Sequence, residues 1–193
     1  RIIKEWRGSH INLTLKKKNY LKKYIGYKKN NDISKFLLKG LKVNLSSSIK
    51  SIEFKSNYWT VHLTDKKRVY FKNLILTCPF PQARFLAKKY LSKKILNLKV
   101  NMLPNITVMV VYKNCKNIPV SSFRYSDQIL SWAANENSKN RFKSNYLLWT
   151  LQSSEKWAKK NINKFKKNKK KTTLTIVKRF EKLTGFKNKN LFF

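Results

Sequence analysis

The side chains best suited to metal binding or nucleophilic chemistry are few and far apart in this sequence. Cys78 and Cys115 stand alone, without a Cys-x-x-Cys pair, and the two histidines, His10 and His62, are distant from both. These spacings exclude the common zinc motifs and provide no disulfide framework, which favours a reducing compartment such as the cytoplasm. His62 lies in an alternating stretch where it faces solvent, so it is assigned no role.

The net charge is extreme, at +37 from 45 basic and 8 acidic residues. Such an excess is typical of proteins that bind nucleic acid or an anionic membrane surface. Its make-up indicates another origin, because 38 basic residues are lysines and 7 are arginines, beside 21 asparagines, 4 glycines and 5 alanines. Lysine and asparagine have AT-rich codons, so an AT-rich genome explains much of the excess. Arginine, which nucleic-acid readers prefer for bidentate contacts, is scarce.

A basic RNA- or DNA-binding protein, of ribosomal or organellar type, is the alternative. It would use the lysine runs 16–18 and 166–171, with Tyr20, Tyr24 and Phe165 for base stacking. A nucleic-acid binder should gather its lysines on one face, whereas base composition spreads them over all solvent-facing positions. Lysines occur in nearly every segment here, which favours an enzyme with a small-molecule substrate and no specific nucleic-acid partner.

With 193 residues, 41% hydrophobic and 13% aromatic, the chain suffices for one sizeable domain or parts of two. Its apolar stretches are too short to cross a bilayer, and no signal peptide is visible. The chain begins at Arg1 and ends at Phe193 without a polar tail. We therefore expect an internal piece of a longer protein.

Hydrophobic periodicity predicts a mixed α/β fold with several helices. Ile33, Phe36 and Leu37 share one face of a helix that Asp32 caps and Gly40 ends. Further helices are predicted over residues 82–90 and 172–184, and a basic helix or loop over residues 154–165.

Alternating apolar and polar residues predict most of the strands. Residues 41–45 alternate as a half-buried strand does, and a meander follows over residues 49–54, 59–63 and 69–71. The run 74–78 is apolar throughout, which predicts a strand buried on both faces of a parallel sheet. Further strands are predicted over residues 106–112, 129–134 and 146–151.

This order of a helix, a strand, a meander and an apolar strand entering a proline-containing loop resembles the FAD-dependent amine oxidases, and among them the renalase-like members. Residues 77–83, Thr-Cys-Pro-Phe-Pro-Gln-Ala, resemble the family's loop at a strand end. Residues 41–52 are similar to the strand that approaches the adenine of FAD, and Tyr24-Ile25-Gly26 resembles the family's Tyr-Val-Gly. Similar segments continue in the same order at residues 59–63, 129–139 and 148–157.

The resemblance implies where the cofactor would bind. FAD contacts are expected from the backbone of Ile49 and from a loop that contains Cys78, Pro79, Pro81 and Gln82. A proline fixes φ and cannot extend a strand, so an ordinary strand-to-helix turn is an equally good interpretation of this loop.

The resemblance also implies a substrate pocket that includes Trp132, Trp149, Tyr24 and Gly26. A position in the hydrophobic core is the alternative for each tryptophan. Lys139 and Arg141, which follow Trp132, are expected to be solvated rather than to meet an anionic substrate.

Two motifs of the family are missing from the sequence. The N-terminal Gly-x-Gly-x-x-Gly, which seats the FAD pyrophosphate at a helix N-terminus, is absent, and so is the C-terminal Gly-Asp segment near the flavin. Asn31-Asp32-Ile33 stands where Gly-Met normally follows Tyr-Val-Gly. The chain alone is therefore expected to hold FAD poorly and to be inactive.

The implied protein is the central part of a two-domain flavoprotein. Residues 30–82 would belong to the FAD domain, and residues 1–29 and 83–193 to a substrate domain with an antiparallel sheet. The implied activity is oxidation of an amine or a dihydronicotinamide-type substrate by hydride transfer to flavin, with O2 as acceptor. Catalytic residues stay unassigned, because the cofactor carries the redox step.

Overall fold

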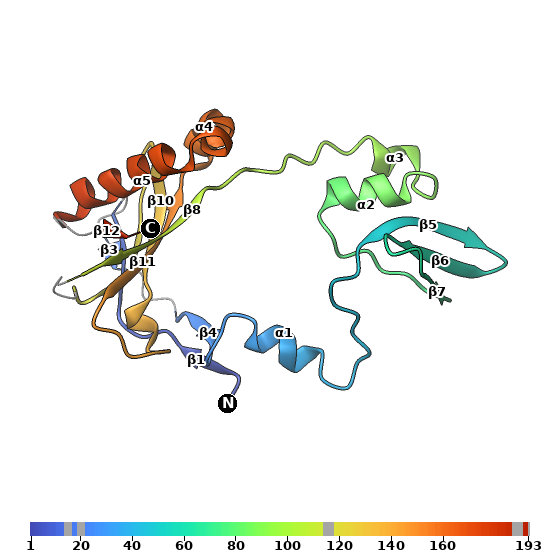
Figure 1. Cartoon of the computed structure of the whole chain (residues 1–193), viewed down its shortest axis with the longest axis horizontal. Coiled ribbons are helices and arrows are strands. Elements are labelled where there is room, and N and C mark those ends of the chain that lie inside the picture. The colour runs from blue at the N-terminus through green and yellow to red at the C-terminus, as the bar shows by residue number, and fades with distance from the viewer. Residues whose placement is uncertain (14–16, 19–21, 114–117, 187–190, 193) are drawn as a thin grey trace. The chain divides into compact units, whose positions relative to one another are not determined.

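The computed structural model describes residues 1–13, 17–18, 22–113, 118–186 and 191–192, and Cys115 lies outside them. The chain forms two compact units (Figure 1). The discontinuous unit consists of residues 1–39 and 103–193, and the inserted unit of residues 40–102. The predicted mixed α/β fold is confirmed. The inserted unit begins and ends later than the predicted segment 30–82, and its assignment to an FAD domain stays a prediction.

The discontinuous unit is built on a seven-stranded sheet in the order β12-β8-β11-β10-β9-β2-β3. In that order, its strands are Leu191–Phe192, Thr107–Tyr112, Leu147–Ser153, Leu130–Asn135, Val120–Arg124, Ser9–Asn12 and Lys17–Lys18. Strands β2 and β9 are parallel, and all other neighbours are antiparallel. A separate two-stranded ladder joins β1 (Ile3–Glu5) to β4 (Tyr24–Gly26).

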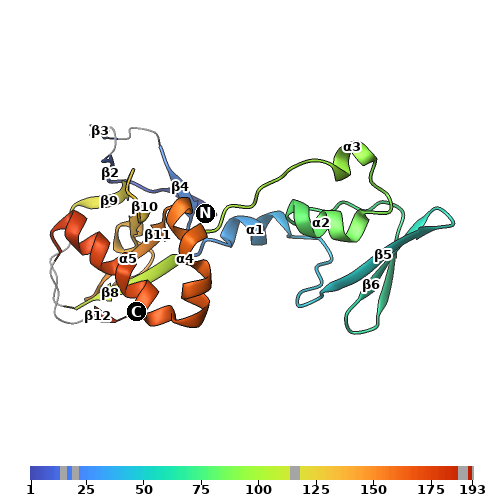
Figure 2. The ribbon, with the colours of Figure 1, turned by 90° about the horizontal axis from the view of Figure 1, so that it is seen from above.

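Helices α4 (Glu155–Lys167) and α5 (Lys169–Thr184) cover one face of the seven-stranded sheet, as two views of the ribbon show (Figures 1 and 2). Residues of β11 alternate strictly between buried and half-buried, because successive side chains of a strand point to opposite faces. The buried row includes Trp149, which packs against Phe180 of α5 with 5.1 Å between ring centroids. Both side chains are completely buried, so this face holds the main core.

The ends of helix α5 follow from its sequence. Asn168 caps it by accepting a hydrogen bond of 3.0 Å from the backbone N–H of Lys171. Gly185 ends it in the left-handed conformation, at φ +73°. The predicted helix 172–184 is confirmed and begins three residues earlier, at Lys169. Within the described part of the chain, no helix combines the length and the apolar character needed to cross a bilayer.

The inserted unit is an antiparallel three-stranded sheet with two helices. Its strands are β5 (Ile49–Lys55), β6 (Tyr58–Leu63) and β7 (Arg68–Phe71), and its helices are α2 (Phe80–Ala87) and α3 (Lys93–Leu96). The predicted meander is confirmed, and the helix predicted over residues 82–90 is α2. A small core joins α2 to the sheet through the buried side chains of Ile52, Val61 and Ala87.

Two strands predicted in the inserted unit are wrong. Residues 41–45 form no strand, and Leu45 is 81% exposed. The run 74–78 pairs with no strand among the described residues, and Ile75 is 85% exposed. A strand buried on both faces needs hydrogen-bonding neighbours and a cover on each side. The described residues of this unit supply neither. Of the run 74–78, only Leu74 and Leu76 pack against the small core.

Helix α1 (Asp32–Leu37) is confirmed, but its cap differs from the prediction. Asn31 occupies the N-cap position, and the Asp32 carboxylate instead accepts hydrogen bonds from the backbone N–H groups of Lys28 and Lys29, at 2.7 and 2.8 Å. These two hydrogen bonds lower the pKa of Asp32. Asp32 therefore stabilises the turn before the helix.

Asp127 links the loop after β9 to helix α5. Its carboxylate accepts the backbone N–H groups of Ile129 and Leu130, at 2.9 and 3.0 Å, and pairs with the guanidinium of Arg179. Burial raises the pKa of Asp127, but the hydrogen bonds from Arg179 and the backbone outweigh this effect and bring it down to about 2.

Because the folded-state pKa of Asp127 lies below its unfolded value, the ionised carboxylate stabilises the fold above about pH 4. This contribution, about 2 kcal/mol, should disappear as the pH falls from about 4 towards 2. We expect Asp127→Asn to lower the free energy of urea unfolding by that amount at pH 7 and to flatten its dependence on pH below 4. Asp65→Asn makes the same charge change in an exposed turn. An equal loss in this control would contradict the prediction.

Candidate functional site

The sheet face turned away from the helices carries polar and aromatic side chains. The register places Trp132 of β10 beside Arg124 of β9, and Ser122 of β9 beside His10 of β2. Side chains of a strand alternate between faces, so these four lie opposite to the core. Together with four neighbours they form what we call the open-face cluster, whose members are Trp6, His10, Lys23, Ser122, Arg124, Trp132, Glu136 and Lys139.

His10 is buried at the centre of this cluster and is held at both ring nitrogens. Nε2 lies 3.0 Å from the carbonyl oxygen of Trp6, and Nδ1 lies 2.8 Å from Oγ of Ser122. A carbonyl oxygen only accepts, so Nε2 carries the proton and Nδ1 accepts the hydroxyl proton of Ser122. Burial lowers the pKa of His10. The hydrogen bond to Trp6 raises this pKa and the charge of Lys23 lowers it, and the net shift is downward. The imidazole is therefore neutral at pH 7.

The indole of Trp6 joins the parts of the cluster. Its Nε1 donates a hydrogen bond of 2.9 Å to Oγ of Ser138. The ring meets His10 and Trp132 edge-on, at centroid distances of 4.8 and 6.4 Å. Two lysine ammonium groups approach the same ring, that of Lys139 at 5.1 Å and that of Lys23 at 5.9 Å from its centroid. Such distances allow cation–π attraction.

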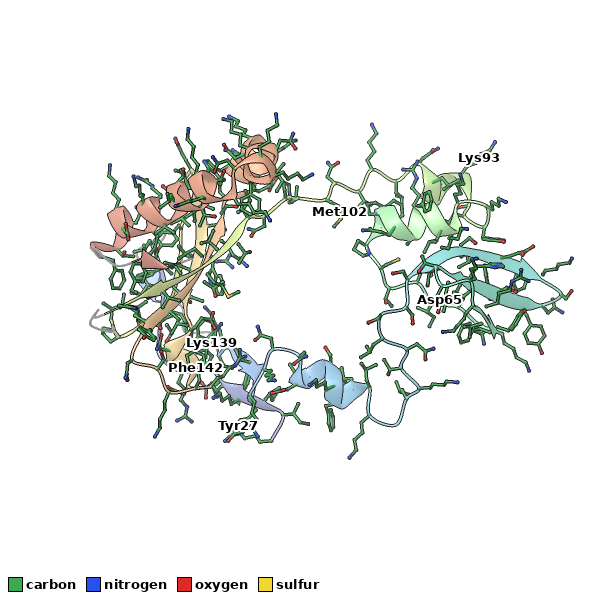
Figure 3. All side chains as sticks on the ribbon, in the orientation of Figure 1. Tyr27, Asp65, Lys93, Met102, Lys139 and Phe142 are labelled. Carbon is green, nitrogen blue, oxygen red and sulfur yellow. The ribbon has the colours of Figure 1, made fainter. Side chains whose placement is uncertain are left out.

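Lys139 is buried, which corrects the expectation that it is solvated. Its side chain is 8% exposed, and its Nζ lies 2.6 Å from Oε1 of Glu136. The hydroxyl of Thr150 donates to the same oxygen at 2.7 Å. Figure 3 shows Lys139 at one end of the sheet. Arg141 donates a hydrogen bond of 3.2 Å from Nε to the carbonyl oxygen of Gly26. It therefore also has a structural partner, in strand β4.

A shallow hollow of about 470 Å³ opens beside Trp132 on this face. Its lining residues are Arg124, Tyr125, Ser131, Trp132 and Gln152. An aromatic wall with a guanidinium and several hydrogen-bonding groups can hold a flat polar molecule. Within the described residues, no three His, Cys, Asp or Glu side chains gather as they would around a metal ion.

Comparisons with known proteins inform the fold of this chain. Neither a protein-family model nor a curated protein sequence matches the chain. A solved structure of a candidate protoporphyrinogen oxidase from Exiguobacterium sp. 255-15 matches with a TM-score of 0.61, over 88% of this chain and 39% of that one, at 12% identity. A redesigned putrescine oxidase matches with a TM-score of 0.53, over 74% of this chain and 32% of that one, at 14% identity.

The fold is that of FAD-dependent amine oxidases. The identities are too low to carry more than the fold, and the chain spans 39% and 32% of the two oxidases. The predicted resemblance is thus supported at the level of the fold, whereas membership of the renalase-like group stays a prediction.

The amine-oxidase fold separates the residues predicted for the substrate pocket. Trp132 lies in the open-face cluster. Trp149 lies on the opposite face of the sheet and is 0% exposed in the core, so its side chain packs against the helices instead of lining the hollow. Tyr24 and Gly26 belong to β4, where Tyr24 is 59% exposed and Gly26 is buried.

The residues predicted for FAD contact all lie in the inserted unit. Ile49 begins β5 with its side chain 39% exposed. Cys78 is an exposed free thiol. Pro79 is the N-cap of α2, Pro81 lies in its first turn, and the backbone N–H of Gln82 donates to the Pro79 carbonyl at 2.9 Å. Cys78, Pro79, Pro81 and Gln82 thus lie together at the start of α2. The role of all five residues in cofactor binding stays a prediction.

Sequence reasoning missed four residues of the cluster, Trp6, His10, Lys23 and Ser122. They lie in short strands or beside them, and Ser122 follows His10 by 112 positions in the chain. Only the parallel pairing of β2 with β9 reveals their proximity.

Lysines are exposed on both units. Helices α4 and α5 carry eleven exposed lysines between residues 155 and 184, and the inserted unit carries another eleven. The lysines are thus spread over the protein, as codon usage predicts. That no specific nucleic acid binds stays a prediction.

Proposed function

We propose that this chain is part of a renalase-like FAD-dependent oxidoreductase that oxidises an amine or a dihydronicotinamide-type substrate, with O2 as the final acceptor. The observation that supports this proposal most is the open-face cluster. Helices cover one face of the seven-stranded sheet in this chain. The other face carries buried polar groups beside two tryptophans. Burying polar groups costs free energy unless they are hydrogen-bonded. A cluster of buried, hydrogen-bonded polar groups outside the hydrophobic core therefore favours a binding site.

The chain's own residues would bind and orient the substrate. Trp132 is half-buried and offers an aromatic surface to a planar ring, and its edge-on contact with the buried Trp6 fixes its orientation. His10 is locked by its two hydrogen bonds and keeps Ser122 in place. Bound FAD would supply the hydride acceptor, so the cluster needs no general base for the redox step itself.

The residues proposed to contact FAD are accessible to a ligand. The side chain of Ile49 is partly exposed, Cys78 is exposed, and the run 74–78 pairs with no strand among the described residues. A backbone of this kind still has N–H and C=O groups to offer to a cofactor. The chain contains no Gly-x-Gly-x-x-Gly, so the pyrophosphate would be held by other polypeptide.

The visible absorption spectrum of the protein tests this proposal. We expect the protein expressed from a gene that includes the flanking coding sequence to show the absorption bands of oxidised flavin. A reduced nicotinamide should bleach these bands under anaerobic conditions. Air should restore the bands if O2 is the acceptor. A colourless protein that takes up no FAD on reconstitution would reject the proposal.

A further inference from the structure

Helix α2 carries apolar side chains on two sides, and the small core of the inserted unit uses only one of them. Ala87 is buried against the sheet of β5, β6 and β7. Positions 81, 84, 85 and 88 share another side, since residues three and four apart lie on one face of a helix. Phe85 is on that side, and 71% of its side chain is exposed. A large aromatic ring turned away from the core leaves apolar surface for another molecule.

A groove of about 890 Å³ lies between this side of α2 and the chain that follows α3. Figure 1 shows that chain running back past α2. Phe80 and Leu96 are half-buried in the groove, and Leu98 and Val100 are exposed along it. Its size and its mainly apolar lining are in the range found for small-molecule sites.

The charged side chains of the groove are all of one sign. Of the described residues that line it, Arg84, Lys88 and Lys99 are cations and none is acidic. Among the described residues, none of the three forms an ion pair with a carboxylate. Arg84 and Lys88 are four positions apart, where like charges destabilise a helix. An anion in the groove would relieve this repulsion and accept charge-assisted hydrogen bonds.

The apolar walls and the unbalanced cations together specify a ligand with two parts. An aliphatic chain would displace water from Phe85, Leu98 and Val100. An acidic head would balance the cations. A small inorganic anion would leave the apolar walls wet, and a neutral hydrocarbon would leave the charges unbalanced.

We propose that this groove binds a fatty acid, with its aliphatic chain along the apolar walls and its carboxylate at Arg84, Lys88 and Lys99. The groove belongs to the inserted unit, whereas the open-face cluster belongs to the discontinuous unit. The fatty-acid site therefore does not depend on the proposed oxidoreductase activity.

Isothermal titration calorimetry with three ligands of equal chain length tests this inference. Decanoate carries the carboxylate, decanol is neutral, and decylamine is a cation. We expect decanoate to bind about tenfold tighter than decanol or more, with an affinity that falls as salt rises. Decylamine should not bind detectably. From octanoate to dodecanoate, the affinity should rise about tenfold for every two methylene groups, because each is removed from water.

Substitutions place the ligand in the groove. Arg84→Gln combined with Lys88→Gln should abolish the preference for decanoate over decanol and leave the binding of decanol unchanged. Phe85→Ser should weaken both ligands about tenfold. Lys55→Gln and Leu45→Ser make the same kinds of change at exposed positions outside the groove, and both should bind as the unchanged protein does. Circular dichroism confirms that each variant is folded.

Equal affinity for decanoate and decanol would overturn the inference, and so would binding that the groove substitutions leave unchanged. A synthetic amphipathic helix of leucine and glutamate tests for a protein partner. If this peptide binds in a manner that Phe85→Ser abolishes while decanoate does not bind, the groove is a protein-docking site and the fatty-acid proposal is wrong. A failure to take up FAD would reject the proposed oxidoreductase and leave the fatty-acid site intact.

Discussion

Phe180→Ala is expected to lower the free energy of unfolding of the discontinuous unit by about 3–5 kcal/mol. Phe180 is 0% exposed, and its ring lies 5.1 Å from that of Trp149 and 5.8 Å from that of Phe186. Alanine would leave a cavity between helix α5 and the sheet, and the surrounding rings can relax into it only in part. Urea unfolding followed by tryptophan fluorescence measures the loss, since Trp149 lines the new cavity.

Phe142→Ala is the matched control for this substitution. Phe142 belongs to the same unit, but 46% of its side chain is exposed. We expect a change several times smaller than that of Phe180→Ala. Similar losses for the two variants would mean that the packing of α5 on the sheet does not hold the unit together.

Gly26→Ala is expected to destabilise the same unit by about 3 kcal/mol or more, the upper range for overpacked sites. A Cβ atom added at Gly26 would lie 2.0 Å from the carbonyl oxygen of Lys29. This oxygen belongs to the backbone, so no side-chain rotation relieves the clash. The β1–β4 ladder, in which Gly26 pairs with Ile3, would have to shift. Thermal unfolding measured by circular dichroism gives the size of the effect.

Gly185→Ala separates this clash from backbone strain. Gly185 has φ +73° and nothing within 4 Å of an added Cβ, so alanine there should cost only about 1–2 kcal/mol for the left-handed conformation. If Gly26→Ala proves the milder of the two, the close approach to Lys29 is not rigid.

Those elements whose signals are local could be predicted from the sequence. The meander of β5, β6 and β7 alternates clearly, and its turns are short. Helix α5 has a cap at Asn168, an apolar face and a terminal glycine. The predicted fold class rested on such elements and is confirmed, and the resemblance to FAD-dependent amine oxidases is supported at the level of the fold.

The candidate site could not be predicted because its signals are not local. Of the open-face cluster, only Trp132 was expected to line a pocket. Strand β9 contains two consecutive serines, which break the alternation of apolar and polar residues that predicts a strand. Strand β2 is short, and its place in the sheet depends on its pairing with β9. Conversely, the runs 41–45 and 74–78 have the pattern of strands but lack neighbouring strands among the described residues. An apolar pattern indicates which side chains a segment could bury. Whether the segment forms a strand depends on a neighbouring strand with which it can pair.

The insertion of one unit into the other also governs the timing of folding during synthesis. The strands of residues 49–71 are consecutive and joined by short turns, so they can pair as soon as they leave the ribosome. Strand β2 must instead wait for β9, because Ser122 follows His10 by 112 positions in the chain. At about 5–20 residues per second, this wait lasts on the order of 5–20 s. In every round of translation β2 can thus pair at once with β3, but the edge that will join β9 stays open for seconds.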